Sequence, residues 1–197
     1  MRNDAFNNRW NLPVIRDNDS KLQAAIANGQ GDYVRIFVMI NNEGFGHSGL
    51  ILDEGENAFL YDPAGTYAGC EEKKCRGSIQ SFRGSGSFFE YPYFDWDSYL
   101  KYQFEDGEDV VVFEFVVPRS QMEQMKDNIL YYSDTATDFT CAKNVARVLR
   151  ESGGVFAGLD EGFFTPWGLK ADLLNIQYHK GVIPHVFITT PAHSPIK

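Results

Sequence analysis

Three residues of the chain have the side chains that thiol acyl-transfer chemistry needs. A thiol can attack a carbonyl carbon, an imidazole can take up and return the proton, and a carboxylate can orient that imidazole. These groups occur in the chain in the order His47, Asp62 and Cys141. We therefore predict a cysteine hydrolase in which Cys141 is the nucleophile, His47 the base and Asp62 the orienting acid.

Cys141 stands in the first turn of a predicted amphipathic helix, with Thr137 or Asp138 expected as the N-cap. Apolar residues follow it at i+4, i+7 and i+8, which predicts that this face of the helix packs on the core. The positive end of the helix dipole lowers the pKa of a thiol, whereas a carboxylate at Asp138 would raise it. The alternative is that Cys141 is an ordinary small buried residue.

His47 begins one predicted strand, 47–52, and Asp62 ends the next, 58–62. A turn at 54–57 would make these strands antiparallel neighbours, so that the start of the first lies opposite the end of the second. A carboxylate in that position would fix the tautomer and orientation of the imidazole.

Other roles for these two residues stay open. His47 could be an ordinary surface histidine, in which case His185, at the start of the last predicted strand, is the main competitor for the base. Asp62 could serve only the turn that follows its strand. Asp53 and Glu43 remain alternative orienting acids.

Composition limits the class of protein. The chain has 197 residues, 43% of them hydrophobic, which fits a single domain over 1–197. A net charge of -9 argues against nucleic acid as a partner, because phosphate binding needs clustered basic residues. No apolar run approaches the ~20 residues of a membrane-spanning helix. The N-terminus lacks the apolar core of a signal peptide, so we expect synthesis in the cytoplasm.

Cys70 and Cys75 lie close together in a polar loop, either as free thiols or as a disulfide formed in an oxidising compartment. No second pair with zinc-finger spacing follows, and we predict neither a metal nor a cofactor.

The sequence pattern predicts an α+β fold with a central, mainly antiparallel sheet packed on the Cys141 helix. Residues 63–87 are predicted to form a loop, and the aromatic segment 88–104 shows neither a helical nor a strand-like hydrophobic period. Ser120 is expected to cap its helix, with Glu123 placed for a capping box. The predicted strands are 34–40, 47–52, 58–62, 110–117 and 184–190, and the predicted helices are 20–28, 120–132, 141–153 and 168–178.

The ordered set resembles the circularly permuted branch of the NlpC-type papain-like cysteine hydrolases, in which the cysteine helix follows the histidine strand. Residues 47–52 are similar to the histidine strand of that family, 60–62 to the place of its third polar residue, and 140–153 to its nucleophile helix. The Asp-Pro-Ala-Gly segment at 62–65 also resembles papain-like toxin domains delivered between bacteria, including type VI secretion effectors.

Two neighbours of the cysteine depart from related patterns. Members that act as lipid acyltransferases usually have Asn before the cysteine, where this chain has Thr140. The order His, Asp, Cys also fits the clan of ubiquitin-like-protein and adenoviral proteases, but that clan prefers Gly after the cysteine, where this chain has Ala142.

The resemblance implies a papain-like fold and a peptidase or amidase that cleaves peptidoglycan peptides as a secreted antibacterial effector. It further implies a secretion machinery and a cognate immunity protein as partners, with action in the periplasm of a target cell. One alternative keeps the triad but acts on a lipid acyl ester, with segment 88–104 lining an acyl groove or simply covering the core. Another is a protease or deconjugase acting on host proteins, and a third is a non-enzymatic binding or immunity-type protein.

Overall fold

The computed structural model describes residues 32–54, 58–65, 67, 80–81, 87–89, 94–132, 139–160, 165–180 and 185–189. The predicted helix 20–28, the cysteine pair at 70 and 75, and most of the predicted turn at 54–57 lie outside these residues. The strands are β1 (Tyr33–Asn41), β2 (His47–Asp53), β3 (Ala58–Asp62), β4 (Gln80–Ser81), β5 (Ser87–Phe89), β6 (Val110–Pro118) and β7 (His185–Thr189). The helices are α3 (Trp96–Gln103), α4 (Arg119–Asp127), α5 (Cys141–Glu151) and α6 (Pro166–Lys180), with a π-helical turn at Asn128–Tyr132 and a 3-10 turn at Gly154–Phe156.

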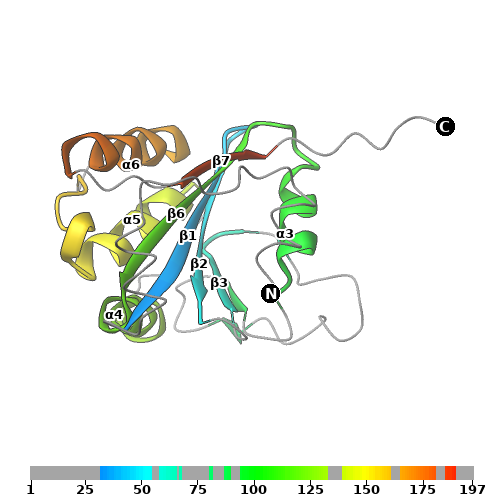
Figure 1. The fold of residues 1–197 in the computed structure, drawn as a ribbon. Helices are drawn as coiled ribbons and strands as arrows, with labels where there is room; N and C mark the ends of the chain where they lie inside the picture. Colours follow the sequence, from blue (N-terminus) through cyan, green and yellow to red (C-terminus); the bar gives the residue numbers. More distant parts are fainter. Residues whose placement is uncertain are drawn as a thin grey trace.

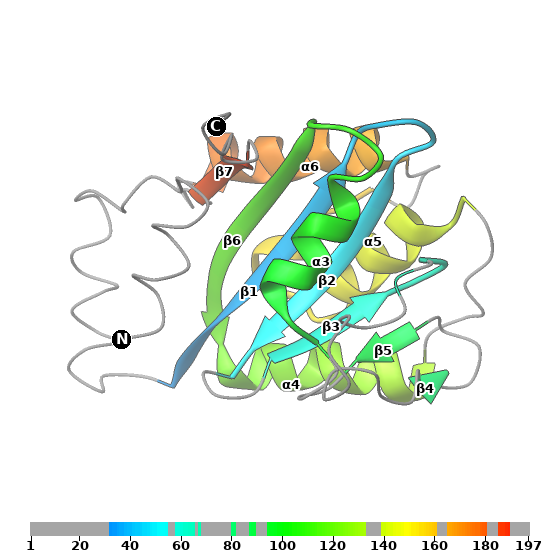
Figure 2. The same ribbon diagram turned by 90° about the vertical axis from the view of Figure 1, so that its right-hand side faces the viewer.

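The strands form one seven-stranded sheet in the order β4-β5-β3-β2-β1-β6-β7, and all the described pairs are antiparallel. The strands predicted from the sequence are confirmed to within two residues at each end. β1, which is a nearly continuous apolar run in the sequence, and β6, which is also mostly apolar, lie side by side between β2 and β7 (Figure 2). Such runs are typical of strands covered on both faces.

Helices cover both faces of the sheet (Figure 1). α3 lies against one face, and α4, α5 and α6 lie against the other. The side chains of β1 alternate between these layers: Ile36 and Val38 join the core under α4, α5 and α6, while Phe37 and Met39 join the core under α3. The protein is therefore α+β, as predicted, with the helix that begins at Cys141 packed on an antiparallel sheet.

The predicted helix capping was wrong in two places. α4 begins directly after Pro118, which ends β6, and Ser120 lies inside the helix without capping it. The backbone N–H of Arg119, the first helical residue, instead donates to the Asp32 carbonyl at 2.7 Å. The N-cap of α5 is Thr140, and not residue 137 or 138, which lie outside the described residues.

The segment 88–104 has more structure than the sequence pattern predicted. Phe88 and Phe89 belong to β5, and the last part of the segment forms α3, whose N-cap Asp95 accepts a hydrogen bond from the Ser98 N–H at 3.3 Å. Among its described residues, the large side chains of Phe88, Phe89, Phe94, Tyr99 and Leu100 are buried. In the part of the chain that the structure describes, no helix is long and apolar enough to cross a membrane.

Candidate active site

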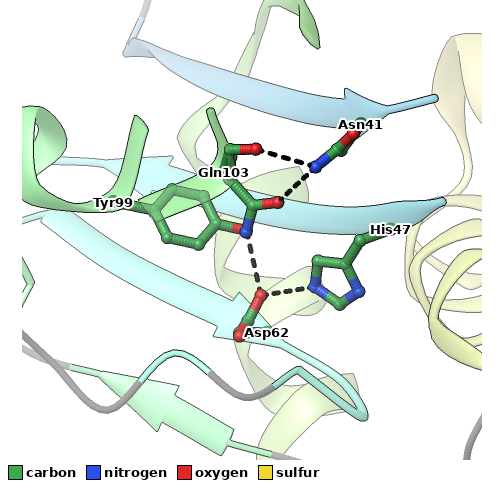
Figure 3. A network of polar contacts seen from close by, with 5 residues as sticks. All are labelled: Asn41, His47, Asp62, Tyr99 and Gln103. Atoms are coloured by element: carbon green, nitrogen blue, oxygen red, sulfur yellow. Dashed lines mark hydrogen bonds and ion pairs between the residues drawn. The ribbon is translucent and has the colours of Figure 1, made fainter. Parts of the chain in front are cut away.

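His47 and Asp62 meet at one end of the β2–β3 pair. The register places Leu50 opposite Tyr61, and continuing it by one residue places Asp62 opposite Gly49, diagonal to His47 on the same face. Nε2 of His47 lies 2.6 Å from Oδ1 of Asp62 (Figure 3). The carboxylate is completely buried and the imidazole is 17% exposed, so the pair opens to the surface only on the histidine side.

The carboxylate of Asp62 is closely packed between Tyr99 and Gly65. Its Oδ1 accepts a second hydrogen bond, 2.9 Å long, from the hydroxyl of Tyr99 on α3. Its Oδ2 has no hydrogen-bond partner among the described residues. A Cβ atom added to Gly65 would lie 1.8 Å from that Oδ2, and one added to Gly49 would lie 2.3 Å from the Tyr99 hydroxyl. Glycine at these two positions thus leaves room for the carboxylate and for its donor.

Cys141 is the first residue of α5, as predicted, and is 5% exposed. Its thiol contacts the side chain of His47 and accepts hydrogen bonds from the backbone N–H groups of Ser48 and Ala142. The hydroxyl of the N-cap Thr140 accepts from Nδ2 of Asn144 at 3.1 Å and makes no capping bond to the helix. The side chain of Thr140 therefore does not cap the first-turn N–H groups, which lack intrahelical partners, and one of them, that of Ala142, donates to the sulfur.

The two reactive groups shift one another toward an ion pair. Burial opposes the charged form of His47, but the charge of Asp62, the hydrogen bond to it and the contact with Cys141 together raise the pKa of His47 from 6.5 to about 10. Burial likewise opposes the Cys141 thiolate, but the hydrogen bond and charge of His47 and the two backbone N–H groups lower the pKa of the thiol. Because Nε2 of the imidazole is engaged by Asp62, Nδ1 is the nitrogen available to the sulfur.

A second polar contact ties α3 to the same end of the sheet. Asn41 lies opposite His47 in the β1–β2 register and is buried. Its Nδ2 donates to the carbonyl oxygen and to Oε1 of Gln103, at 3.0 and 3.2 Å (Figure 3). Gln103 follows Tyr99 by four residues, so one face of α3 directs both polar side chains toward the strand ends that hold His47 and Asp62.

The alternative acids and the alternative base lie elsewhere. Asp53 is the last residue of β2, at the end of the strand opposite His47, and forms an ion pair with Arg35 at 2.9 Å. Oε1 of Glu43 accepts from the backbone N–H of Asp109 at 3.2 Å. His185 begins β7, which is separated from β2 by β1 and β6. Of the acids considered from the sequence, Asp62 is the one that the structure brings to His47.

Tyr99 and Ser48 were missed by the sequence analysis. Ser48 contributes a backbone N–H, which no residue type reveals, whereas Tyr99 could have been found by recognising the N-cap Asp95 and the helix that follows it. Among the described residues, no group of three or more histidine, cysteine, aspartate or glutamate side chains is placed to hold a metal ion.

Comparisons with models of known protein families, with curated proteins and with solved structures found no significant match. The resemblance to permuted NlpC-type hydrolases therefore stays a prediction from the sequence.

Proposed function

We propose that the protein is a cysteine hydrolase in which Cys141, His47 and Asp62 act as nucleophile, general base and acid, and orienting carboxylate. The observation that supports this best is the continuous chain of contacts from Asp62 through His47 to Cys141, with the thiol pKa lowered at a helix N-terminus. An ordinary buried cysteine has neither a charged partner nor a lowered pKa.

In the first half of the reaction, the Cys141 thiolate attacks the carbonyl carbon of the substrate and forms a tetrahedral oxyanion. We propose that this oxyanion is stabilised by the N–H of Cys141, at the start of α5, and by the N–H of Ser48, which donates to the sulfur. The His47 imidazolium then gives its proton to the leaving nitrogen, the carbon–nitrogen bond breaks, and an acyl thioester on Cys141 remains.

In the second half, His47 is neutral and takes a proton from water as the water oxygen attacks the thioester carbon. Collapse of this second intermediate breaks the carbon–sulfur bond, releases the carboxylic acid and restores the thiolate–imidazolium pair. Asp62 holds Nε2 throughout, which keeps Nδ1 directed toward the reacting atoms.

For the substrate, we propose an amide bond in peptidoglycan peptides, cleaved by the protein as a secreted antibacterial effector in the periplasm of a target cell. The support is the ordered likeness of 47–65 and 139–154 to permuted NlpC-type hydrolases and effector toxins. A cognate immunity protein in the producing cell belongs to the same proposal.

A lipid acyl ester is the second candidate substrate. Phe88, Phe89 and Phe94, expected on this hypothesis to line an acyl groove, are buried in the core and do not support it. Phe45 and Phe139 support an acyl-ester substrate, because each lies two residues before a proposed catalytic residue. Their side chains are 80% and 69% exposed, and their ring centroids are 5.3 Å apart. Exposed aromatic rings beside a nucleophile can bind an apolar acyl chain.

The test uses the purified full-length chain with two substrates, isolated peptidoglycan and phospholipid vesicles. Soluble peptide fragments and released fatty acid are measured by mass spectrometry, beside Cys141→Ala and His47→Ala. Cys70→Ala/Cys75→Ala is the matched control, because it removes two thiols but leaves the proposed nucleophile.

Peptide release that requires Cys141 and His47 would support the peptidoglycan substrate. Fatty-acid release with the same requirement, reduced by Phe45→Ser/Phe139→Ser, would replace it with the acyl ester. Bacterial growth with the chain expressed with and without an export signal tests the site of action. No product from either substrate, together with a Cys141 thiol that iodoacetamide alkylates no faster than a free thiol, would refute the hydrolase.

A further inference from the structure

Tyr99 is a completely buried tyrosine whose hydroxyl donates to the carboxylate oxygen that also contacts His47. Burial, and next the negative charge of Asp62, raise the pKa of this phenol well above its usual value, so the hydroxyl keeps its proton and remains a donor. A buried hydroxyl costs free energy unless it is hydrogen-bonded, and here its bond is to Asp62.

The surroundings of Tyr99 fix the position of its hydroxyl. The ring makes edge-on contacts with Tyr67 and Phe94, at centroid distances of 5.1 and 6.1 Å, which hold it on the α3 side of the sheet. The hydroxyl occupies the space that a Cβ on Gly49 would need. Gly49 lies in β2, two residues after His47. The strand that carries the imidazole therefore also has the glycine against which the Tyr99 hydroxyl packs.

We propose that Tyr99 is a positioning residue that holds the Asp62 carboxylate in the orientation in which it engages Nε2 of His47. Two donors that converge on one oxygen fix the rotation of a carboxylate more firmly than one. The other oxygen, Oδ2, does not help, since it has no partner in the described part of the chain. This inference rests on the proposed hydrolase, because Asp62 and His47 matter for catalysis only if Cys141 is a nucleophile.

The first test compares Tyr99→Phe with Tyr102→Phe, which removes a hydroxyl one turn further along α3. Two properties are measured in the folded full-length chain: the titration midpoint of His47 by NMR of 15N-histidine-labelled protein, and the rate at which iodoacetamide alkylates Cys141 at pH 7. We expect Tyr99→Phe to lower the His47 midpoint and to slow alkylation roughly tenfold, the size of one lost hydrogen bond to a charged group. Tyr102→Phe should change neither, and an unchanged midpoint and rate in Tyr99→Phe would overturn the proposal.

A second test uses the contact between Gly49 and Tyr99. Gly49→Ala should reproduce the effects of Tyr99→Phe, because its methyl group takes the place of the hydroxyl. In Gly49→Ala/Tyr99→Phe the hydroxyl is absent, so the alanine should add little, and the two effects should be far from additive. Additive effects would mean that the two residues act independently, and would also overturn the proposal. Because Gly49→Ala keeps the tyrosine, it tests the same contact if Tyr99→Phe does not fold.

The failure of this inference is distinct from the failure of the proposed function. If Cys141 of the unmodified chain reacts like a free thiol and His47→Ala does not change its rate, the hydrolase is refuted. If that rate depends on His47 but neither property responds to Tyr99→Phe, only the role of Tyr99 is refuted.

Discussion

The charge of Asp62 should determine whether Cys141 is reactive at neutral pH. Asp62→Asn is the sharpest perturbation, because the amide keeps an oxygen that can accept from Tyr99 and from His47 while the negative charge is lost. Burial by itself lowers the pKa of His47, and the Asp62 charge is the first of the effects that oppose it. We therefore expect the pKa of His47 in Asp62→Asn to fall to 6.5 or below.

The size of the effect follows from the two titrations. The rise of the His47 pKa from 6.5 to about 10 corresponds to on the order of 5 kcal/mol in favour of the imidazolium. Without the imidazolium, the Cys141 thiol loses the main cause of its lowered pKa and returns toward or above 9.0. A thiol with that pKa is about 1% thiolate at pH 7. Since a more basic thiolate is also intrinsically more nucleophilic, the net loss in alkylation rate should be about tenfold or more.

The assay is alkylation of Cys141 by iodoacetamide across the pH range, followed by mass spectrometry of the peptide that contains it. Asp53→Asn is the matched control: it makes the same chemical change at the far end of β2 and breaks the ion pair with Arg35. Asp53→Asn should leave the pH dependence of Cys141 alkylation unchanged even if it lowers the free energy of unfolding. A folded Asp62→Asn variant with the profile of the unmodified chain would refute the reasoning.

Three further predictions concern the fitted carboxylate, the ion pair and the core. Gly65→Ala should displace the Asp62 carboxylate and slow alkylation, whereas Gly158→Ala, whose added Cβ meets no atom within 4 Å, should not. A raised histidine pKa contributes stability that is complete below pH 6.5 and is lost as the pH rises through about 10. In urea melts, the excess stability of the unmodified chain over Asp62→Asn should therefore shrink over that range, and a constant difference would contradict the shift of His47. Leu149→Ala, in the completely buried face of α5, should cost about 2–5 kcal/mol of unfolding free energy in the same melts.

The strands and the helix at Cys141 could be predicted because each is encoded locally. β1 and β6 are mostly apolar, interrupted by Arg35 and by Glu114, and the apolar spacing after Cys141 has a helical period, so period and composition suffice. The meeting of His47 with Asp62 followed from one further assumption, that a short turn joins β2 and β3. The structure pairs these strands antiparallel in the required register.

α3 was not recognised from the sequence, because its inward face is not purely apolar. Tyr99, Leu100 and Gln103 are buried with the spacing of one helix face, but Tyr99 and Gln103 make buried polar contacts there, so hydrophobicity alone does not mark that face. Tertiary contacts with β1 and β3, distant in sequence, determine its burial pattern. The N-cap signal at Asp95 was the one local sign of this helix, and without it the donor to Asp62 was missed although Asp62 itself was found.

The same alternation explains why the proposed site lies at the end of a strand. Asp62 faces the α3 layer, where Tyr99 reaches it, whereas Cys141 belongs to the core on the opposite face of the sheet. Side chains within a strand point to one face or the other, so a residue in the middle of β2 could not contact both layers. His47 is the first residue of β2, where the sheet ends and α5 begins, and it contacts Asp62 on one side and Cys141 on the other. Its position at the strand end is thus what lets one imidazole join an acid and a thiol held by opposite layers of the fold.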